Sequence, residues 1–90
     1  MKEKEAFLEK TATVQTDTLA LVLYNDDVNT FDHVIFCLMN ICKLEALPAE
    51  QCAFIVHYSG KCVVKSGTYE VLEPLCVALL EKGLSAKIEA

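Results

Sequence analysis

The chain has 90 residues, which is room for one small domain, and 53% of them are hydrophobic. Its net charge of −5 combines eight lysines and no arginine with thirteen acidic residues. This balance argues against nucleic acid as a partner, because phosphate binding requires a basic patch. No apolar run approaches the roughly 20 residues of a membrane span, and Met1–Lys10 lacks the apolar segment of a signal peptide. We therefore expect a cytoplasmic protein without membrane contact.

The first part of the chain differs in character from the rest. Residues 1–17 carry scattered charges, small residues and threonines, so we expect a flexible N-terminal arm followed by one domain over residues 18–90. The apolar run Leu19–Tyr24 then predicts a strand. Since this strand is apolar on both faces, it should be covered on both or lie in the centre of its sheet.

Two helices are predicted after this strand. Apolar residues at helical spacing predict the first helix from Phe31 to about Lys43, with Thr30 or Asn29 as its N-cap. Pro48 should open the second helix at its first position. Gly60 should end this helix as a left-handed residue.

The remainder alternates between strands and one helix. Lys61–Lys65 predicts an edge strand protected by its lysines, and Ser66-Gly67 should turn the chain. Thr68 can cap a third helix, which Pro74 should kink or delay. Gly83 should end that helix, and the alternation that follows predicts a last strand, so the element order is β-α-α-β-α-β.

The stretch Asn25-Asp26-Asp27 lies between the first strand and the first helix. An amide and two carboxylates in such a loop suit a cation or an amine, which can also donate hydrogen bonds. The alternative from residue chemistry is a turn whose side chains bond their own backbone. His57, late in the second helix, either completes this polar corner or interacts with the C-terminal end of its own helix.

The cysteines do not predict a catalytic or metal site. We expect reduced, mostly buried thiols that pack as small hydrophobic groups. His33 and Cys37, four residues apart, could share a metal, but zinc needs three or four ligands and no third ligand is near. No hydrolase, phosphate-loop or zinc-protease motif is present, so we expect no enzyme, cofactor or metal. The five cysteines are Cys37, Cys42, Cys52, Cys62 and Cys76.

Two motifs together resemble those of a known family. Asn25-Asp26-Asp27, followed by a helix and then by Val56-His57-Tyr58-Ser59-Gly60-Lys61, is similar to the ClpS adaptors, and the resemblance covers about Leu19 to Glu89. These adaptors deliver substrates with destabilising N-terminal residues (N-degrons) to an AAA+ Clp unfoldase–protease. The resemblance implies a non-catalytic monomer whose partners are N-degron substrates and a ClpA- or ClpC-like unfoldase. It also implies an α+β fold, with a small three-stranded antiparallel sheet packed on three helices, similar to the ribosomal-stalk C-terminal domain.

The resemblance also implies a site. It assigns substrate α-amine binding to Asn25, Asp26, Asp27 and His57. It assigns a hydrophobic pocket for a bulky first side chain to Phe31, Val34, Ala53, Val56 and Leu84. It assigns unfoldase docking to Glu70. The chain departs from the family pattern where Asn29 replaces a threonine, Phe31 a methionine and Ala53 a bulkier methionine.

Two other functions remain open from the sequence. One is a Clp-docking modulator that lacks recognition of N-terminal residues. The other is a small thiol- or metal-binding protein that uses His33, Cys37 and Cys42.

Overall fold

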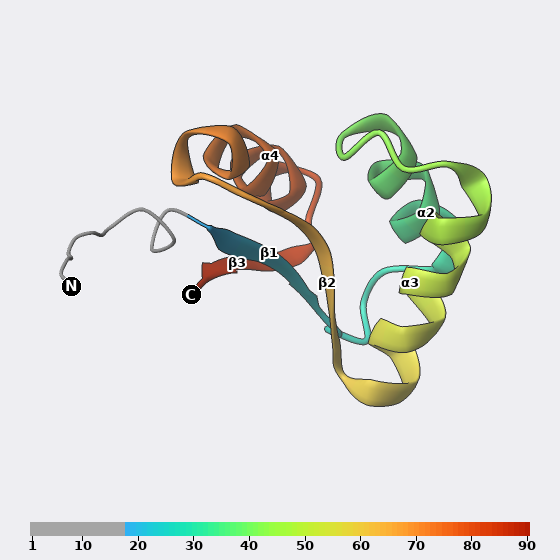
Figure 1. Cartoon of the computed structure of the whole chain (residues 1–90). Helices are drawn as coiled ribbons and strands as arrows, with labels where there is room; N and C mark the ends of the chain where they lie inside the picture. The colour runs from blue at the N-terminus through green and yellow to red at the C-terminus, as the bar shows by residue number, and fades with distance from the viewer. Residues whose placement is uncertain (1–17) are drawn as a thin grey trace, which may run out of the picture.

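The structure, a computed structural model, describes residues 18–90, so the predicted N-terminal arm lies outside the described residues. These residues form six elements in the predicted order β-α-α-β-α-β, and Figure 1 shows how they are arranged. They form an α+β fold, as expected. The elements are β1 (Leu19–Tyr24), α2 (Phe31–Asn40), α3 (Ala46–Ser59), β2 (Lys61–Gly67), α4 (Tyr69–Glu81) and β3 (Ser85–Glu89).

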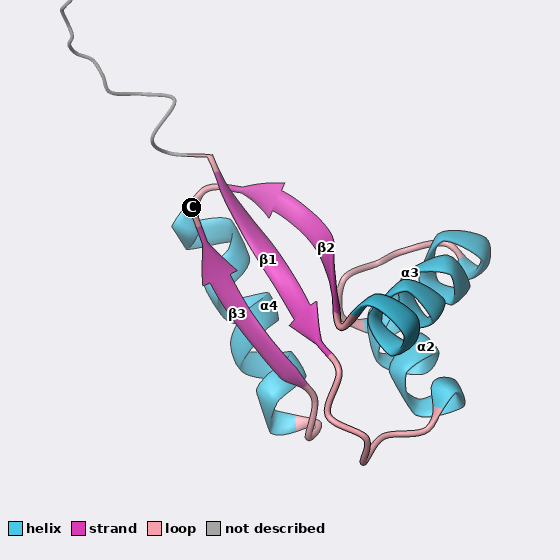
Figure 2. Cartoon of the chain, turned by 90° about the horizontal axis from the view of Figure 1, so that it is seen from below, coloured by secondary structure: helices cyan, strands magenta, loops and turns pink. Residues whose placement is uncertain are grey.

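The three strands form one antiparallel sheet in the order β2-β1-β3. The first strand is central, which is one of the two arrangements expected for it, and Leu23 pairs with Cys62 on one side and with Ala86 on the other. Figure 2 shows α4 behind the strands and the α2–α3 pair beside β2. Leu21 and Leu23 of β1 are fully buried in the core between the sheet and the helices.

Local side-chain chemistry sets several helix ends. The Thr30 hydroxyl accepts a hydrogen bond from the backbone N–H of His33 at 3.1 Å, which confirms Thr30 as the N-cap of α2. Thr68 caps α4 in the same way. Gly60 ends α3 with a φ of 96°, as predicted, because a glycine adopts the left-handed region without steric cost.

The first helix ends earlier than predicted. α2 stops at Asn40 instead of continuing to about Lys43. Lys43 adopts a φ of 61°, and the backbone N–H of the next residue, Leu44, donates to the carbonyl of Leu38 at 3.2 Å. This arrangement closes the helix C-terminus with a left-handed residue that is not glycine.

Two other expectations for the elements are wrong, and a third is wrong in part. α3 begins at Ala46, two residues before Pro48, which was predicted to open it. Pro48 is tolerated in the first turn because backbone N–H groups there have no hydrogen-bond acceptor within the helix. Ser66 and Gly67 extend β2 and pair with β1 instead of turning the chain. Pro74 lies inside α4 and does not delay its start, because the Thr68 cap fixes the first turn before Pro74 is reached, and the alternative that Pro74 kinks the helix stays a prediction.

Four of the five cysteines are buried and all five are free thiols, as expected. Burial raises the pKa of the thiols of Cys37, Cys42, Cys52 and Cys76, so these side chains are protonated at neutral pH. They pack as small hydrophobic groups in the common core with the leucines of β1, α2 and α4.

Candidate functional site

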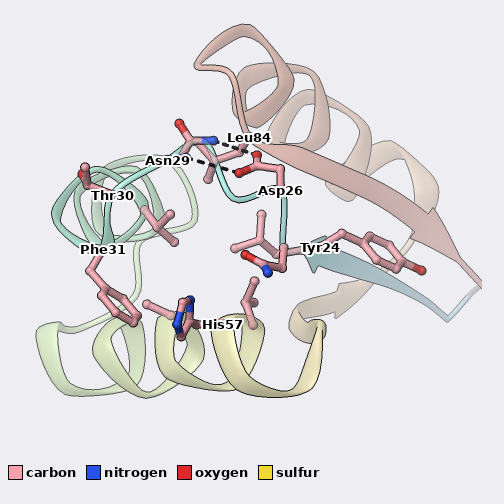
Figure 3. A pocket seen from close by; sticks show the side chains of 12 residues that line it. Tyr24, Asp26, Asn29, Thr30, Phe31, His57 and Leu84 are labelled. Atoms are coloured by element: carbon pink, nitrogen blue, oxygen red, sulfur yellow. Dashed lines mark hydrogen bonds between the residues drawn. The ribbon is translucent and has the colours of Figure 1, made fainter.

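A cavity of about 190 Å³ opens where the loop after β1 meets α2, α3 and the start of β3 (Figure 3). It has a polar side and an apolar side. Eight of the nine residues expected for amine binding or for the hydrophobic pocket line it, and Asp27 does not. The polar lining includes Asn25, Asp26, Asn29 and His57, and the apolar lining includes Phe31, Val34, Ala53, Val56 and Leu84.

The backbone and side chain of Asn25 have separate roles. Its backbone N–H donates to the carbonyl of Gly60 at 2.9 Å, which ties the loop to the end of α3. Its side-chain Nδ2 donates to Oδ1 of Asp27 at 3.2 Å. Because the amide nitrogen is turned to Asp27, the amide oxygen of Asn25 remains as an acceptor at the cavity.

Asp26 organises the loop through four hydrogen bonds. Its Oδ1 accepts from the backbone N–H groups of Val28 at 3.0 Å and Asn29 at 3.3 Å. Its Oδ2 accepts from the side chain of Asn29 at 2.7 Å and from the Ser85 hydroxyl at 3.4 Å. A carboxylate has about four lone-pair positions, so the described donors already occupy those of Asp26. Asp26 therefore supplies negative charge to the cavity but has little capacity left to accept a hydrogen bond from a ligand.

Asp27 has a different position from its neighbour. It is exposed, has a φ of 63° and does not line the cavity. Aspartate is one of the few residue types that enter the left-handed region at modest cost. Its side chain accepts a hydrogen bond from the Asn25 amide, so Asp27 affects the site only indirectly, by orienting that amide. The structure thus separates two carboxylates that are adjacent in sequence.

The Asp26 carboxyl has a pKa below its usual value. Partial burial raises this pKa, but the hydrogen bonds from Val28, Asn29 and Ser85 favour the ionised form and outweigh burial. The negative charge at the polar side of the cavity is therefore maintained well into the acidic range.

The fold should lose the stabilisation from Asp26 on acidification. Because the folded pKa is lowered, the contribution is fully present above the unfolded pKa of about 3.9 and disappears as the pH falls through the folded value. We expect the difference in unfolding free energy between the parent and Asp26→Asn to be largest near pH 7 and to shrink near pH 3. Urea denaturation at both pH values measures this difference, and an equal difference at both would contradict the assignment.

Asn29 lines the cavity, although the sequence suggested it only as a possible helix cap and as a departure from the family pattern. Its Nδ2 donates to Asp26 and also to the carbonyl of Gly83 at 2.9 Å, 54 residues away in the chain. Figure 3 shows Asn29 and Asp26 turned toward each other at the upper side of the cavity. Asn29 therefore connects the acidic loop to the segment that enters β3. No local signal indicates a bond over this separation.

The apolar side combines a buried floor with an aromatic rim. Ala53, Val56 and Leu84 are buried, and the small side chain of Ala53 leaves space in the cavity. The ring of Phe31 lies 5.1 Å from that of His57, centroid to centroid, and the two stand side by side in Figure 3. His57 therefore lines the cavity from α3, although its position in the last turn also suits the C-terminal end of that helix.

The remaining candidates lie elsewhere. Nε2 of His33 is 2.9 Å from the carbonyl of Lys82 and 3.7 Å from the sulfur of Cys37. This nitrogen therefore contacts the end of α4 and its own helix, away from the cavity. Within residues 18–90, no group of three or more histidine, cysteine or acidic side chains is placed to hold a metal. Glu70 is exposed in the first turn of α4 and does not line the cavity. No helix in the described part is long and apolar enough to cross a membrane.

A small α+β domain with a mainly apolar cavity and a few polar groups at one side of it has the form of a ligand-binding site. The profile of the ClpS family, described as "ATP-dependent Clp protease adaptor protein ClpS", matches residues 14–87. The chain therefore belongs to the ClpS family, whose members are non-catalytic adaptors, as the sequence motifs indicated.

Individual relatives agree with this membership. The ClpS adapter protein of Thermosynechococcus vestitus is 38% identical over 66 residues, which cover 72% of this chain and 70% of that protein. The corresponding protein of Campylobacter jejuni is 34% identical over 68 residues, 76% of this chain and 71% of that protein. A segment of the E3 ubiquitin-protein ligase UBR1 of Drosophila melanogaster is 40% identical over 58 residues. This segment covers 64% of this chain, which spans only 3% of the ligase.

A solved structure supports the fold. It is that of Agrobacterium tumefaciens ClpS2 bound to L-phenylalaninamide, with a TM-score of 0.70 and 18% sequence identity. The match covers 81% of this chain and 95% of that chain. The three-stranded sheet with three helices is therefore the ClpS-like fold.

Proposed function

We propose that the cavity binds the free α-amino group and the bulky apolar first side chain of N-degron substrates, which the chain then delivers to a Clp unfoldase–protease. The observation that carries this proposal is the division of one small cavity into a negatively charged polar side and an apolar side. A volume of about 190 Å³ is below the range of about 300–1,000 Å³ for drug-sized ligands, so it suits a single residue. The related ClpS2 structure holds L-phenylalaninamide, which supports this ligand class.

The polar side offers a complement to a protonated amine. Such an amine has three donors and a positive charge. The Asn25 amide oxygen and a ring nitrogen of His57 are the available acceptors, and Asp26 supplies the opposite charge from a position that its own hydrogen bonds fix. Asp27 contributes by holding the Asn25 amide in orientation. Under this proposal all four predicted amine-site residues would have a role, but the roles would differ.

The apolar side would receive the first side chain. Burial of a leucine or phenylalanine side chain contributes about 1.5–3 kcal/mol, which is enough to select these residues over small or polar ones. Ala53 leaves depth in the cavity, while the Phe31 ring forms its wall beside Val34. We expect this combination to accept an aromatic ring.

Delivery requires a second surface. We propose that Glu70, in the exposed first turn of α4, contacts a ClpA- or ClpC-like unfoldase. Because Glu70 does not line the cavity, substrate and unfoldase would be bound at different places. A Clp-docking modulator without N-terminal recognition would use the same surface and leave the cavity empty of substrate.

Single substitutions at the two acceptors test the proposal. We expect Asn25→Ala and His57→Ala each to weaken binding of a labelled peptide that begins with phenylalanine about tenfold, since each removes one hydrogen bond to a charged group. Fluorescence anisotropy measures the Kd, and thermal unfolding checks that the fold is retained. The loop should stay in place in Asn25→Ala because its backbone bond to Gly60 remains.

Asn40→Ala is a suitable control. Asn40 is an exposed asparagine at the end of α2 whose side chain donates to the carbonyl of Phe36, outside the cavity. Its replacement should leave the Kd unchanged. If either Asn25→Ala or His57→Ala bound the peptide as well as the parent and this control, the assignment of that residue would be wrong.

A further inference from the structure

An aromatic ledge lies directly outside the apolar side of the cavity. It consists of Phe54 and Tyr58 on α3, which are four residues apart and 53% and 75% exposed. Their rings are nearly parallel, at 7°, with centroids 6.0 Å apart. Two large aromatic side chains that stack on each other and remain exposed to solvent need a reason beyond the stability of the domain.

The ledge is continuous with the cavity. The Phe31 ring, which lines the cavity, lies 5.1 Å from the ring of Phe54. The His57 ring also lines the cavity. Its centroid lies 4.7 Å from the centroid of the Tyr58 ring, and the two ring planes meet at 87°, in an edge-to-face arrangement. Each ledge ring therefore lies against a ring of the cavity wall, and Phe31 connects the apolar side of the cavity to Phe54 on the exposed face of α3.

We propose that this ledge receives the second side chain of a bound peptide and selects for apolar or aromatic residues at that position. The inference rests on the proposed function, because it requires a first residue in the cavity. A cavity of about 190 Å³ accommodates one residue, so the peptide must leave through the mouth. Since consecutive Cα atoms are about 3.8 Å apart, the second residue remains at the rim, where the Phe31 ring joins the ledge.

The stacked rings suit such a contact. The two exposed rings present apolar area against which a leucine or an aromatic side chain can be partly buried. Phenylalanine and tyrosine lose little side-chain entropy when they are covered. A serine or glycine at the second position would leave the ledge exposed and gain nothing from it.

The test compares three ligands: phenylalaninamide and two peptides beginning Phe-Leu and Phe-Ser with the same continuation. We expect the parent to bind the Phe-Leu peptide about fivefold more tightly than the Phe-Ser peptide, because the ledge buries only part of the second side chain. In Phe54→Ala and in Tyr58→Ala this ratio should fall toward one. Both variants are needed because each ledge ring contacts a different cavity residue, Phe54 contacting Phe31 and Tyr58 contacting His57, so a fall in the ratio common to both variants points to the ledge.

Phe36→Ala is the matched control. Phe36 is a 60% exposed phenylalanine on α2 that does not line the cavity, so its variant should keep the parent's ratio. If the parent binds phenylalaninamide but shows equal affinity for the two peptides, the ledge proposal is overturned and the proposed function stands. If the parent does not bind phenylalaninamide, both fail.

A second copy of the chain is the other possible occupant of the ledge. Sedimentation of the parent as a dimer that Tyr58→Ala converts to a monomer would assign the ledge to self-association and overturn the proposal. A parent that sediments as a monomer, with a peptide ratio that depends on both rings, supports it.

Discussion

Acetylation of the α-amino group of a peptide that begins with phenylalanine is expected to weaken its binding to this chain about a hundredfold. The acetyl group removes the positive charge that the Asp26 carboxylate would attract and reduces three donors to one. The acceptors of Asn25 and His57 would then be only partly paired by the peptide that covers them. Two lost hydrogen bonds to a charged group amount to about 3 kcal/mol, which corresponds to the hundredfold change.

The measurement uses one peptide sequence, labelled at its C-terminal end, with a free and with an acetylated N-terminus. Fluorescence anisotropy against the parent chain gives both Kd values. Equal binding of the two forms, or binding of neither, would contradict recognition of the α-amine. Either result would leave the ClpS-like fold and family membership unchanged and would favour a docking-only adaptor.

Replacement of Asp26 by asparagine is expected to weaken binding of the free peptide about thirtyfold, because it removes the charge opposite the amine. It should also lower the unfolding free energy by about 1–2 kcal/mol. The asparagine amide can still accept hydrogen bonds from Val28 and Asn29 through its oxygen. Its NH₂ group, however, would face the side-chain nitrogen of Asn29, which is itself a donor. Kd values from anisotropy and urea denaturation at neutral pH measure the two effects.

Asp27→Asn is the matched control for this variant. It makes the same chemical change one residue further along, at an exposed position with a φ of 63° that asparagine also tolerates. The asparagine oxygen can still accept from Asn25, so binding should change less than threefold. If Asp27→Asn weakened binding as much as Asp26→Asn, Asp26 would not be the carboxylate that matters.

The sequence by itself determined the elements whose signals are local. The apolar run Leu19–Tyr24 specified the central strand with its observed bounds. Thr30, Thr68 and Gly60 marked helix ends, because a cap or a left-handed residue acts on backbone groups only a few positions away. The paired Asn-Asp-Asp and Val-His-Tyr motifs were sufficient to indicate the family.

One boundary depended on contacts between distant segments. Ser66 and Gly67 have turn-forming chemistry, but pairing with Ala20 and Leu19 of the central strand makes them part of β2. In β2, pairing with a distant strand therefore outweighed a weak local preference. The end of α2 is instead a local feature, in which Lys43 is left-handed and the backbone N–H of Leu44 donates to the carbonyl of Leu38 in the same helix.

The site shows the same division. Sequence and resemblance named the candidate residues, and whether they bind an amine stays a prediction. Only the tertiary structure decided that Asp26 faces the cavity while Asp27 is exposed, and that Asn29 joins the loop to Gly83. Asp26 and Asp27 are the same residue type at adjacent positions. Their roles therefore depend on which hydrogen-bond donors the rest of the fold places next to each carboxylate. The donors from Ser85 and the acceptor at Gly83 lie more than 50 residues further along the chain, and only the packing of β3 beside β1 places them there.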